Sequence, residues 1–314
     1  MQNAQTQIMQ RKKQRKTLRY IKKNYDLYLL LLIPVVYIII FSYGPLYGII
    51  IAFKDYNPGD GIFGSKWVGL HHFKVFIESY NFMMILKNTV ILNLYGLIAG
   101  FPIPIIVALM FNELKNRNLR ICMQTISYAP HFISVVVMCG MIMIFLSPTT
   151  GLVNHVRQML GMDTISFMQE AKYFRHIFVW TGVWQEVGWN TIIYFAALST
   201  VDQELIDAAK IDGAGRFRII WNINIPAILP TIVITLIMSC GNILSIGFEK
   251  VYLLQNSLNI DTSEVISTYV YKMGLRSARY SFGTAVGLFN SVANFIMLAL
   301  VNTVAKRVNE TSLW

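Results

Sequence analysis

One apolar stretch, residues 176–199, carries side chains suited to binding a sugar. It contains Trp184, Glu186, Trp189 and Asn190. Residues three and four positions apart lie on one face of a helix, so Glu186, Trp189 and Asn190 share a face. Aromatic rings stack on the apolar C–H patches of sugars, while carboxyl and amide oxygens accept hydrogen bonds from sugar hydroxyls. This pattern predicts a sugar-binding face.

The depth of Glu186 supports a functional role. It lies about ten residues into its run, roughly 15 Å at 1.5 Å per residue, or half of a hydrocarbon core of about 30 Å. A carboxyl group at that depth is costly and by default indicates a functional site. Alternatively, Glu186 is neutral or paired at a subunit interface and the tryptophans form an interfacial belt. Later runs add Asn242, Asn290 and Asn294, which either line the same pathway or hold helices together.

The sequence contains none of the common motifs of covalent or metal catalysis. There is no Gly-x-x-x-x-Gly-Lys-Ser/Thr, no His-Glu-x-x-His and no Gly-x-Ser-x-Gly. The five histidines and three cysteines show no metal-ligand spacing, and we interpret His131 as a local cap or interface residue. We therefore expect no catalytic residue, bound cofactor or metal in this chain.

The composition requires a membrane. Hydrophobic residues make up 55% of the chain and charged residues 14%, and the mean hydropathy is +0.50. The first apolar run is too long for a signal-peptide core and lacks a cleavage pattern, so we expect it to be retained. We predict an all-α integral membrane protein with one six-helix domain at 27–305. Six runs are each long enough to cross a bilayer: 27–53, 85–111, 121–146, 176–199, 223–248 and 283–305.

The basic residues predict the orientation of these helices. Eight of the 27 lysines and arginines lie within residues 11–23, just before the first run. The positive-inside rule places the tails 1–26 and 306–314 and the loops 112–120 and 200–222 in the cytoplasm, because these segments hold 16 basic residues and the opposite loops 11. This placement accounts for the net charge of +11 without nucleic acid as a partner, and the first tail can lie against membrane lipid.

The segment 202–226 has the features of a docking element. Asp202 is a plausible N-cap, Glu204 lies in the first turn of the following helix, and Gly213 can end that helix in the left-handed region. A second short helix can begin near Gly215. Small side chains permit close approach of a partner, and an apolar stripe follows them; these residues are Ala208, Ala209, Gly213 and Ala214, and then Phe217, Ile220 and Trp221.

This segment resembles the EAA loop of ABC-importer permease subunits. That motif reads Glu-Ala-Ala, three residues, Gly, nine residues, then Ile-x-Leu-Pro. The chain matches it at Ala208, Ala209, Gly213, Ile223 and Pro226. Asp207 stands where Glu is usual, and Ile225 where Leu is usual. The strings at 41–57 and 67–73 are similar to the LplB-like branch of carbohydrate permeases, which also resembles the maltose permeases.

The resemblance implies a type I ABC-importer permease fold and a role as half of an oligosaccharide pore. It implies a second homologous permease, cytoplasmic ATPase subunits that bind ATP and Mg, and an extracellular solute-binding protein. The expected location is a bacterial cell membrane, with both termini in the cytoplasm. The residues expected to couple the pore to the ATPase are Glu204, Asp207, Ala208, Ala209, Asp212, Gly213, Phe217 and Pro226.

Three alternatives stay open at this point. The permease could carry another solute, such as a polyol, a glycerophosphodiester or a peptide. An ion-driven carrier would depend on an ion gradient and not on ATP. A membrane-embedded enzyme would turn over substrate as the purified chain alone.

Overall fold

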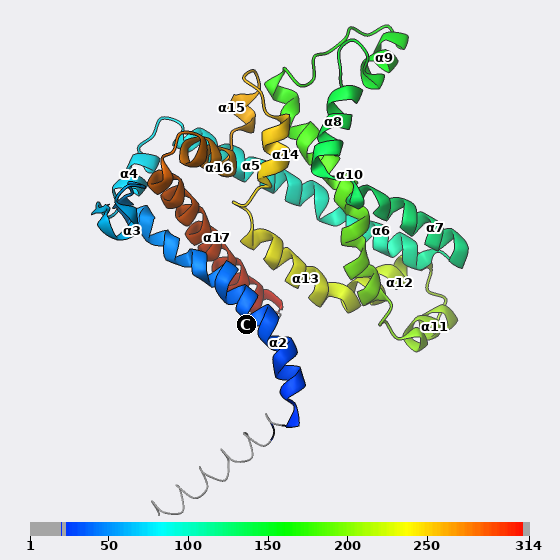
Figure 1. Ribbon diagram of the computed structural model, residues 1–314. Coiled ribbons are helices and arrows are strands. Elements are labelled where there is room, and N and C mark those ends of the chain that lie inside the picture. Colours follow the sequence, from blue (N-terminus) through cyan, green and yellow to red (C-terminus); the bar gives the residue numbers. More distant parts are fainter. Residues whose placement is uncertain (1–19, 21–22, 310–314) are drawn as a thin grey trace, which may run out of the picture.

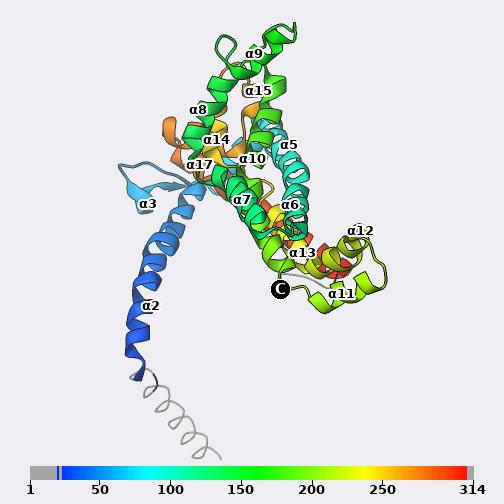
Figure 2. The same cartoon turned by 90° about the vertical axis from the view of Figure 1, so that its right-hand side faces the viewer.

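The computed structural model describes Tyr20 and residues 23–309, and helices dominate this part of the chain (Figure 1). The first apolar run forms one long helical segment made of α2 (Tyr25–Ile38), a π-helical turn (Ile39–Tyr43) and a 3₁₀ segment (Gly44–Phe53). Pro34 lies inside α2. No residue of α2 is buried, and both views show this helix standing away from the others (Figures 1 and 2).

A short excursion follows the first run and departs from the all-α prediction. Strand β1 (Lys54–Asp55) pairs antiparallel with β2 (Lys66–Trp67), with Lys54 opposite Trp67. The short helices α3 (Gly61–Gly64) and α4 (His71–Ile77) complete it. Strands of two residues form only a small local sheet, so the fold is still classified as helical.

The second run forms α5 (Phe82–Gly100) and α6 (Pro102–Glu113), which follow each other almost without interruption. The run predicted at 121–146 does not form one continuous helix. Helix α7 (Arg117–Tyr128) continues into a 3₁₀ turn (Ala129–Phe132), and α8 (Val135–Phe145) then starts in a direction 96° away. Pro130 and the N-cap at Ser134 cause the break, because the Ser134 hydroxyl accepts a hydrogen bond from the Val137 amide, 3.3 Å away.

The fourth run forms α10 (Ala171–Leu198), which lies at the centre of the bundle. It packs against α5, α6, α7 and α13 (Ile225–Gly241) and against the short helices α14 (Phe248–Leu254) and α15 (Ile260–Ser263). The preceding loop contains α9 (Leu152–Met159), which lies at the opposite end of the molecule from α11 (Gln203–Ile211) (Figures 1 and 2). Two buried apolar clusters join α10 to its neighbours: one contains Phe174 and Val251, and the other contains Tyr194 and Ile228. A third cluster, which contains Phe76, joins residues 75–86 to residues 266–289.

The docking segment forms α11 (Gln203–Ile211) and α12 (Arg216–Ile219). Helix α12 runs through a π-helical segment (Ile220–Asn224) into α13 (Ile225–Gly241), so the second docking helix and the fifth run are one helix of 26 residues. The π turn precedes Pro226, which lacks an N–H group, and such turns often occur at functional sites.

The fifth run ends earlier than predicted, at Gly241 instead of 248. The Asn242 side chain donates to the Met238 carbonyl over 3.0 Å, and the Asn294 side-chain oxygen accepts from the Leu244 amide over 2.9 Å, so polar groups satisfy the helix end. The remaining elements are α14 (Phe248–Leu254), α15 (Ile260–Ser263), α16 (Ile266–Val270), a π-helical segment (Tyr271–Arg276) and α17 (Tyr280–Asn309).

Within the described residues, four helical segments are long and apolar enough to cross a membrane, and a fifth is added if the bent pair is one span. Helix α10 has 28 residues but falls short in hydropathy because it contains Gln185, Glu186 and Asn190. The residues that make α10 a candidate site therefore also weaken its membrane signal. The four segments are Tyr25–Phe53, Phe82–Glu113, Arg216–Gly241 and Tyr280–Arg307.

Candidate substrate pathway and coupling surface

A cavity of about 1000 Å³ lies between α5, α6, α10 and α13, and α14 contributes to its wall. Four of the seven residues predicted for the substrate pathway line it: Glu186, Trp189, Asn190 and Asn242. Further polar side chains come from other elements, and they are Asn93, Gln185, Thr235, Ser239, Ser245 and Lys250. The cavity has the mixture of apolar wall and few polar groups that is typical of a ligand site.

The three other predicted pathway residues lie outside this lining. Trp184 is 48% exposed, on another part of α10. Asn294 holds the end of α13, because its amide accepts from Leu244 and also donates to the Ser245 hydroxyl over 2.7 Å. The Asn290 side-chain oxygen is buried and has no hydrogen-bond partner among the described residues. Asn294 therefore joins helices within this chain, which was the alternative role considered for it.

Glu186 contacts a histidine that the sequence did not reveal as a partner. The Nδ1 atom of His131 lies 2.9 Å from Glu186 Oε2. The imidazole also stacks on the indole of Trp189, with ring centroids 4.3 Å apart and planes 5° apart. His131 thus covers one face of the Trp189 indole and forms a hydrogen bond with one oxygen of Glu186. The Glu186 side chain is 44% exposed, so its other oxygen remains accessible to a ligand.

The break between α7 and α8 positions His131. The 3₁₀ turn that contains it crosses α10, and the Gln185 side-chain amide donates to the Ile133 carbonyl over 2.9 Å. Gly188 allows this close crossing, because a Cβ atom there would overlap the Ser127 carbonyl. Pro130 and Ser134 are sequence signals for a break in this run, but they do not show which helix the break meets, so the sequence could not place His131 beside Glu186.

Lys250 is a second lining residue that the sequence analysis missed. Its ammonium donates to the Phe178 carbonyl over 2.8 Å and lies 4.9 Å from the centre of the Phe178 ring. The absence of a side chain at Gly182 makes room for it, since a Cβ there would lie 3.1 Å from Nζ. Burial lowers the pKa of Lys250 to about 8, so the charged form still predominates at neutral pH.

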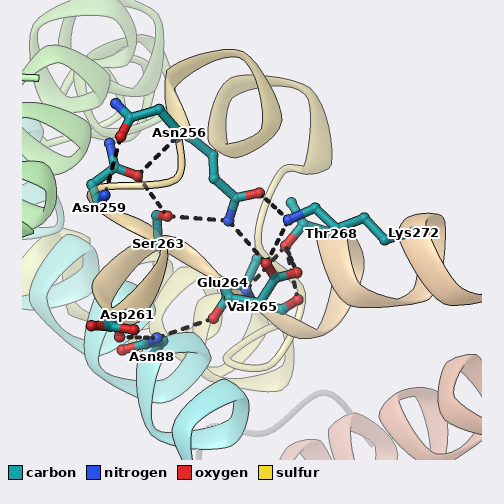
Figure 3. Close-up of polar contacts among 10 residues, drawn as sticks. Asn88, Asn256, Asn259, Asp261, Ser263, Glu264, Val265, Thr268 and Lys272 are labelled. Carbon is teal, nitrogen blue, oxygen red and sulfur yellow. Dashed lines mark hydrogen bonds and ion pairs between the residues drawn. The ribbon is translucent and has the colours of Figure 1, made fainter. Parts of the chain in front are cut away.

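A polar network fixes α14, which carries Lys250, to the rest of the bundle (Figure 3). The Asn259 amide donates to the carbonyl of Leu254 at the end of α14, over 3.1 Å. Glu264, whose side chain is 6% exposed, pairs with Lys272 over 2.6 Å. Asn88 on α5 donates to the carbonyls of Asp261 and Glu264 over 2.8 and 3.2 Å. Every member is satisfied by another part of the chain, which makes this region rigid.

The coupling segment has the local geometry that was predicted. The Asp202 carboxylate accepts from the Glu204 amide over 2.9 Å, and Glu204 lies in the first turn of α11. Gly213 has φ +76°, and the amide of Ala214 donates to the Ala209 carbonyl over 2.8 Å. This is a Schellman ending of a helix. Gly215 then precedes α12, so the predicted helix-turn-helix is confirmed.

Helices α11 and α12, which carry most of the predicted coupling residues, lie at one end of the molecule (Figure 1). Phe217 is 81% exposed and Trp221 67%, whereas Ile206 and Ile219 are buried and hold the pair of helices against the bundle. Asp207 accepts from Lys210 over 2.8 Å as an i,i+3 pair. The remaining predicted coupling residues lie at the surface except for half-buried Ala209; they are Glu204, Ala208, Asp212, Gly213 and Pro226.

A bundle of membrane-length helices around a largely apolar cavity with a few polar groups, with an exposed helix-turn-helix at one end, is the arrangement expected of a membrane permease. The family model of binding-protein-dependent transport system inner membrane components matches residues 100–310, and the chain belongs to this family. Its members are permease subunits of ABC importers and are not enzymes themselves. The chain is therefore a multi-pass membrane protein that acts in transport, as the EAA resemblance predicted.

Individual relatives match along nearly their whole length. Protein LplB of Bacillus subtilis (strain 168) is 43% identical over 94% of this chain and 92% of its own. The polygalacturonan/rhamnogalacturonan transport system permease protein YteP of the same organism is 41% identical over 96% and 94%. A crystal structure of a bacterial ABC transporter that imports the acidic polysaccharide alginate contains a chain with a TM-score of 0.86 and 38% identity, covering 94% of this chain and 99% of that one.

Proposed function

We propose that this chain is one of two homologous permease subunits of an ATP-driven bacterial importer of oligosaccharides. The observation that carries the proposal is the cavity, where α10 presents a carboxyl, an indole and an amide (Glu186, Trp189 and Asn190) to one space. These are the groups that bind sugar hydroxyls and C–H faces. Sugar-linked relatives support it, namely the YteP permease and the alginate transporter.

We propose six membrane crossings in the domain 27–305, with the tails 1–26 and 306–314 in the cytoplasm. Helix α10 is one of these crossings despite its low hydropathy, because 28 residues at about 1.5 Å each exceed a hydrocarbon core of about 30 Å. The start of α2, the end of α17 and the α11–α12 pair lie toward the same end of the molecule, which supports a shared cytoplasmic side. The excess of basic residues in these segments identifies that side as the cytoplasmic one.

Each proposed partner binds a different part of the permease. Cytoplasmic ATPase subunits, which bind ATP and Mg, dock on the segment 202–226 through Phe217 and Trp221. A second permease closes the open side of the cavity. An extracellular solute-binding protein delivers the sugar; the alginate transporter has been solved with its pentasaccharide-bound periplasmic protein. ATP-driven changes at the coupling segment then switch the pore between its two openings.

The test is oligosaccharide uptake by cells that lack this chain, with and without its restoration. We expect uptake only when the chain is restored, and only with an intact ATPase subunit. Collapsing the ion gradients at constant ATP separates this mechanism from an ion-driven carrier. Turnover of a sugar by the purified chain alone would favour an enzyme, and restored uptake of a polyol, glycerophosphodiester or peptide instead of an oligosaccharide would reject the proposed substrate.

A further inference from the structure

Lys250 is a cation in the cavity wall that forms no ion pair with an acidic side chain in the described part of the chain. Among the described residues, four other lysines form ion pairs with carboxylates: Lys74, Lys172, Lys210 and Lys272. Lys250 forms none, and its single hydrogen bond goes to the Phe178 carbonyl. An ammonium group has three N–H donors, so two remain for a ligand. Keeping a half-buried charge without a counter-charge is costly unless something else pairs with it.

The nearby carboxylate does not fill that role. Glu186 lies one helical turn beyond Gly182, against which the Lys250 ammonium rests, and it favours the charged form of Lys250 from a distance. Its Oε2 atom is engaged by His131, and no ion pair joins Glu186 to Lys250. Positive and negative groups therefore stand separately along the same wall of the cavity.

The ammonium group of Lys250 is held in place by contacts within the protein and needs no ligand to position it. Phe178 and Gly182 on α10 hold Nζ from one side. The network of Figure 3 anchors the far end of α14 through Asn259, which also donates to the Met168 carbonyl over 3.1 Å. Groups held in place in this way bind with little loss of conformational freedom. A merely structural lysine does not require space for a ligand beside it, whereas Lys250 lines the cavity.

We propose that Lys250 binds the carboxylate of an acidic sugar unit, so that this permease transports oligosaccharides that contain uronic acids. The inference rests on the proposed function and specifies its substrate class. Glu186, Trp189 and Asn190 line the same cavity and are available to the sugar unit that adjoins a uronate at Lys250. Glu186 repels a sugar carboxylate beside it, whereas Lys250 attracts one. Together the two residues determine which sugar unit of the oligosaccharide lies beside each of them.

The test uses the complete transporter, with its partner permease, ATPase and binding protein, and two matched probes. These are trigalacturonate and its carboxyl-reduced, neutral counterpart of equal length and linkage. Lys250→Gln keeps a donor toward Phe178 but removes the charge. We expect uptake of trigalacturonate at subsaturating concentration to fall about tenfold or more, and uptake of the neutral probe to change less than about twofold.

Each comparison is made between variant and wild type for the same probe, so the selectivity of the unchanged binding protein cancels. Lys250→Arg should retain most trigalacturonate uptake, and Lys74→Gln, on the exposed face of α4, should match wild type. Gly182→Ala gives a second test that keeps the lysine, because the added methyl group would lie 3.1 Å from Nζ and push it aside by a few tenths of an ångström. It should also reduce uptake of the acidic probe selectively, even if Lys250→Gln does not assemble.

The possible results separate the two proposals. Equal losses for both probes would show that Lys250 has only a structural role, and no loss for either probe would show that it does not contact the substrate; either result overturns this inference. Wild-type uptake of the neutral probe without trigalacturonate would overturn the acidic substrate class while leaving oligosaccharide import intact. If the wild-type transporter takes up no oligosaccharide of either kind, the proposed function itself fails, and this inference fails with it.

Discussion

Glu186 has one oxygen against His131 and one available to a ligand, which allows its two possible roles to be separated. If it binds a sugar hydroxyl, its charge matters. If it only joins the α7–α8 break to α10, the hydrogen bond to His131 matters and the charge matters less. A glutamine at this position retains the acceptor oxygen for His131 Nδ1 and loses the charge.

We expect Glu186→Gln to lower oligosaccharide uptake by about tenfold, since hydrogen bonds to a charged group contribute about 1.5–3 kcal/mol. Assembly of the complex and basal ATPase activity should be retained. Uptake is measured in cells and ATPase activity on the purified complex, with Glu78→Gln on the exposed end of α4 as the control. Failure to assemble would identify Glu186 as a structural residue, and normal uptake would remove it from the pathway.

At the scale of elements, the turn between α11 and α12 depends on backbone conformation and not on space. Gly213 has φ +76°, and no atom lies within 4 Å of a Cβ built there. A β-branched residue in the left-handed region costs about 1–2 kcal/mol, whereas asparagine adopts it more readily. The close approach that was also considered for Gly213 is not present in this chain by itself.

Gly213→Val should therefore reduce ATP-driven uptake about fivefold or more while membrane insertion stays normal, because 1–2 kcal/mol corresponds to roughly a 5- to 30-fold change in a conformational equilibrium. Gly213→Asn is the matched control and should keep most of the activity. Uptake and ATPase rates are compared on the same preparations. Wild-type uptake by the valine variant would contradict the proposed coupling role of this turn.

The crossing of α10 with the α7–α8 break depends on space instead. A Cβ at Gly188 would overlap the Ser127 carbonyl, a backbone atom that cannot move aside cheaply. We expect Gly188→Ala to destabilise the protein by about 1–3 kcal/mol and to lower the yield of assembled complex. Thermal stability in detergent measures this effect. Gly140→Ala on α8, where a Cβ meets nothing within 4 Å, should behave like wild type.

At the scale of the whole molecule, this chain leaves much apolar and polar surface uncovered. Every residue of α2 is outside the core, and the cavity that contains Glu186 is bounded by this chain on only part of its perimeter. Lipid can cover α2, but it cannot pair with the half-exposed carboxyl group of Glu186. A second permease subunit can do both.

Expression of this chain alone should accordingly give little monodisperse protein and no transport. Co-expression with a homologous permease from the same transport system should raise the yield several-fold. Size-exclusion chromatography in detergent gives the readout, and a reconstituted uptake assay tests the activity. A stable, transport-active single subunit would show that the exposed polar wall needs no partner.

Several features of this protein were determined by local sequence. Composition and run length required a membrane bundle, and the comparisons confirm the family that the EAA spacing indicated. Capping at Asp202 and the left-handed Gly213 were predictable because both depend on residues a few positions apart. The face shared by Glu186, Trp189 and Asn190 was predictable for the same reason, since helical periodicity alone places them together.

Only the tertiary structure decided which residues lie opposite this face of α10. The contacts of His131 with Glu186 and of Lys250 with Phe178 join residues 55 and 72 positions apart. They exist because α7 and α8 meet at 96° and because α14 is anchored by the Asn259 and Glu264 network. The same packing set the end of α13 at Gly241 and assigned Asn294 to a helix contact. Apolar runs carry hydrophobicity without direction, so their crossings depend on which backbones can approach closely, as Gly188 allows at Ser127.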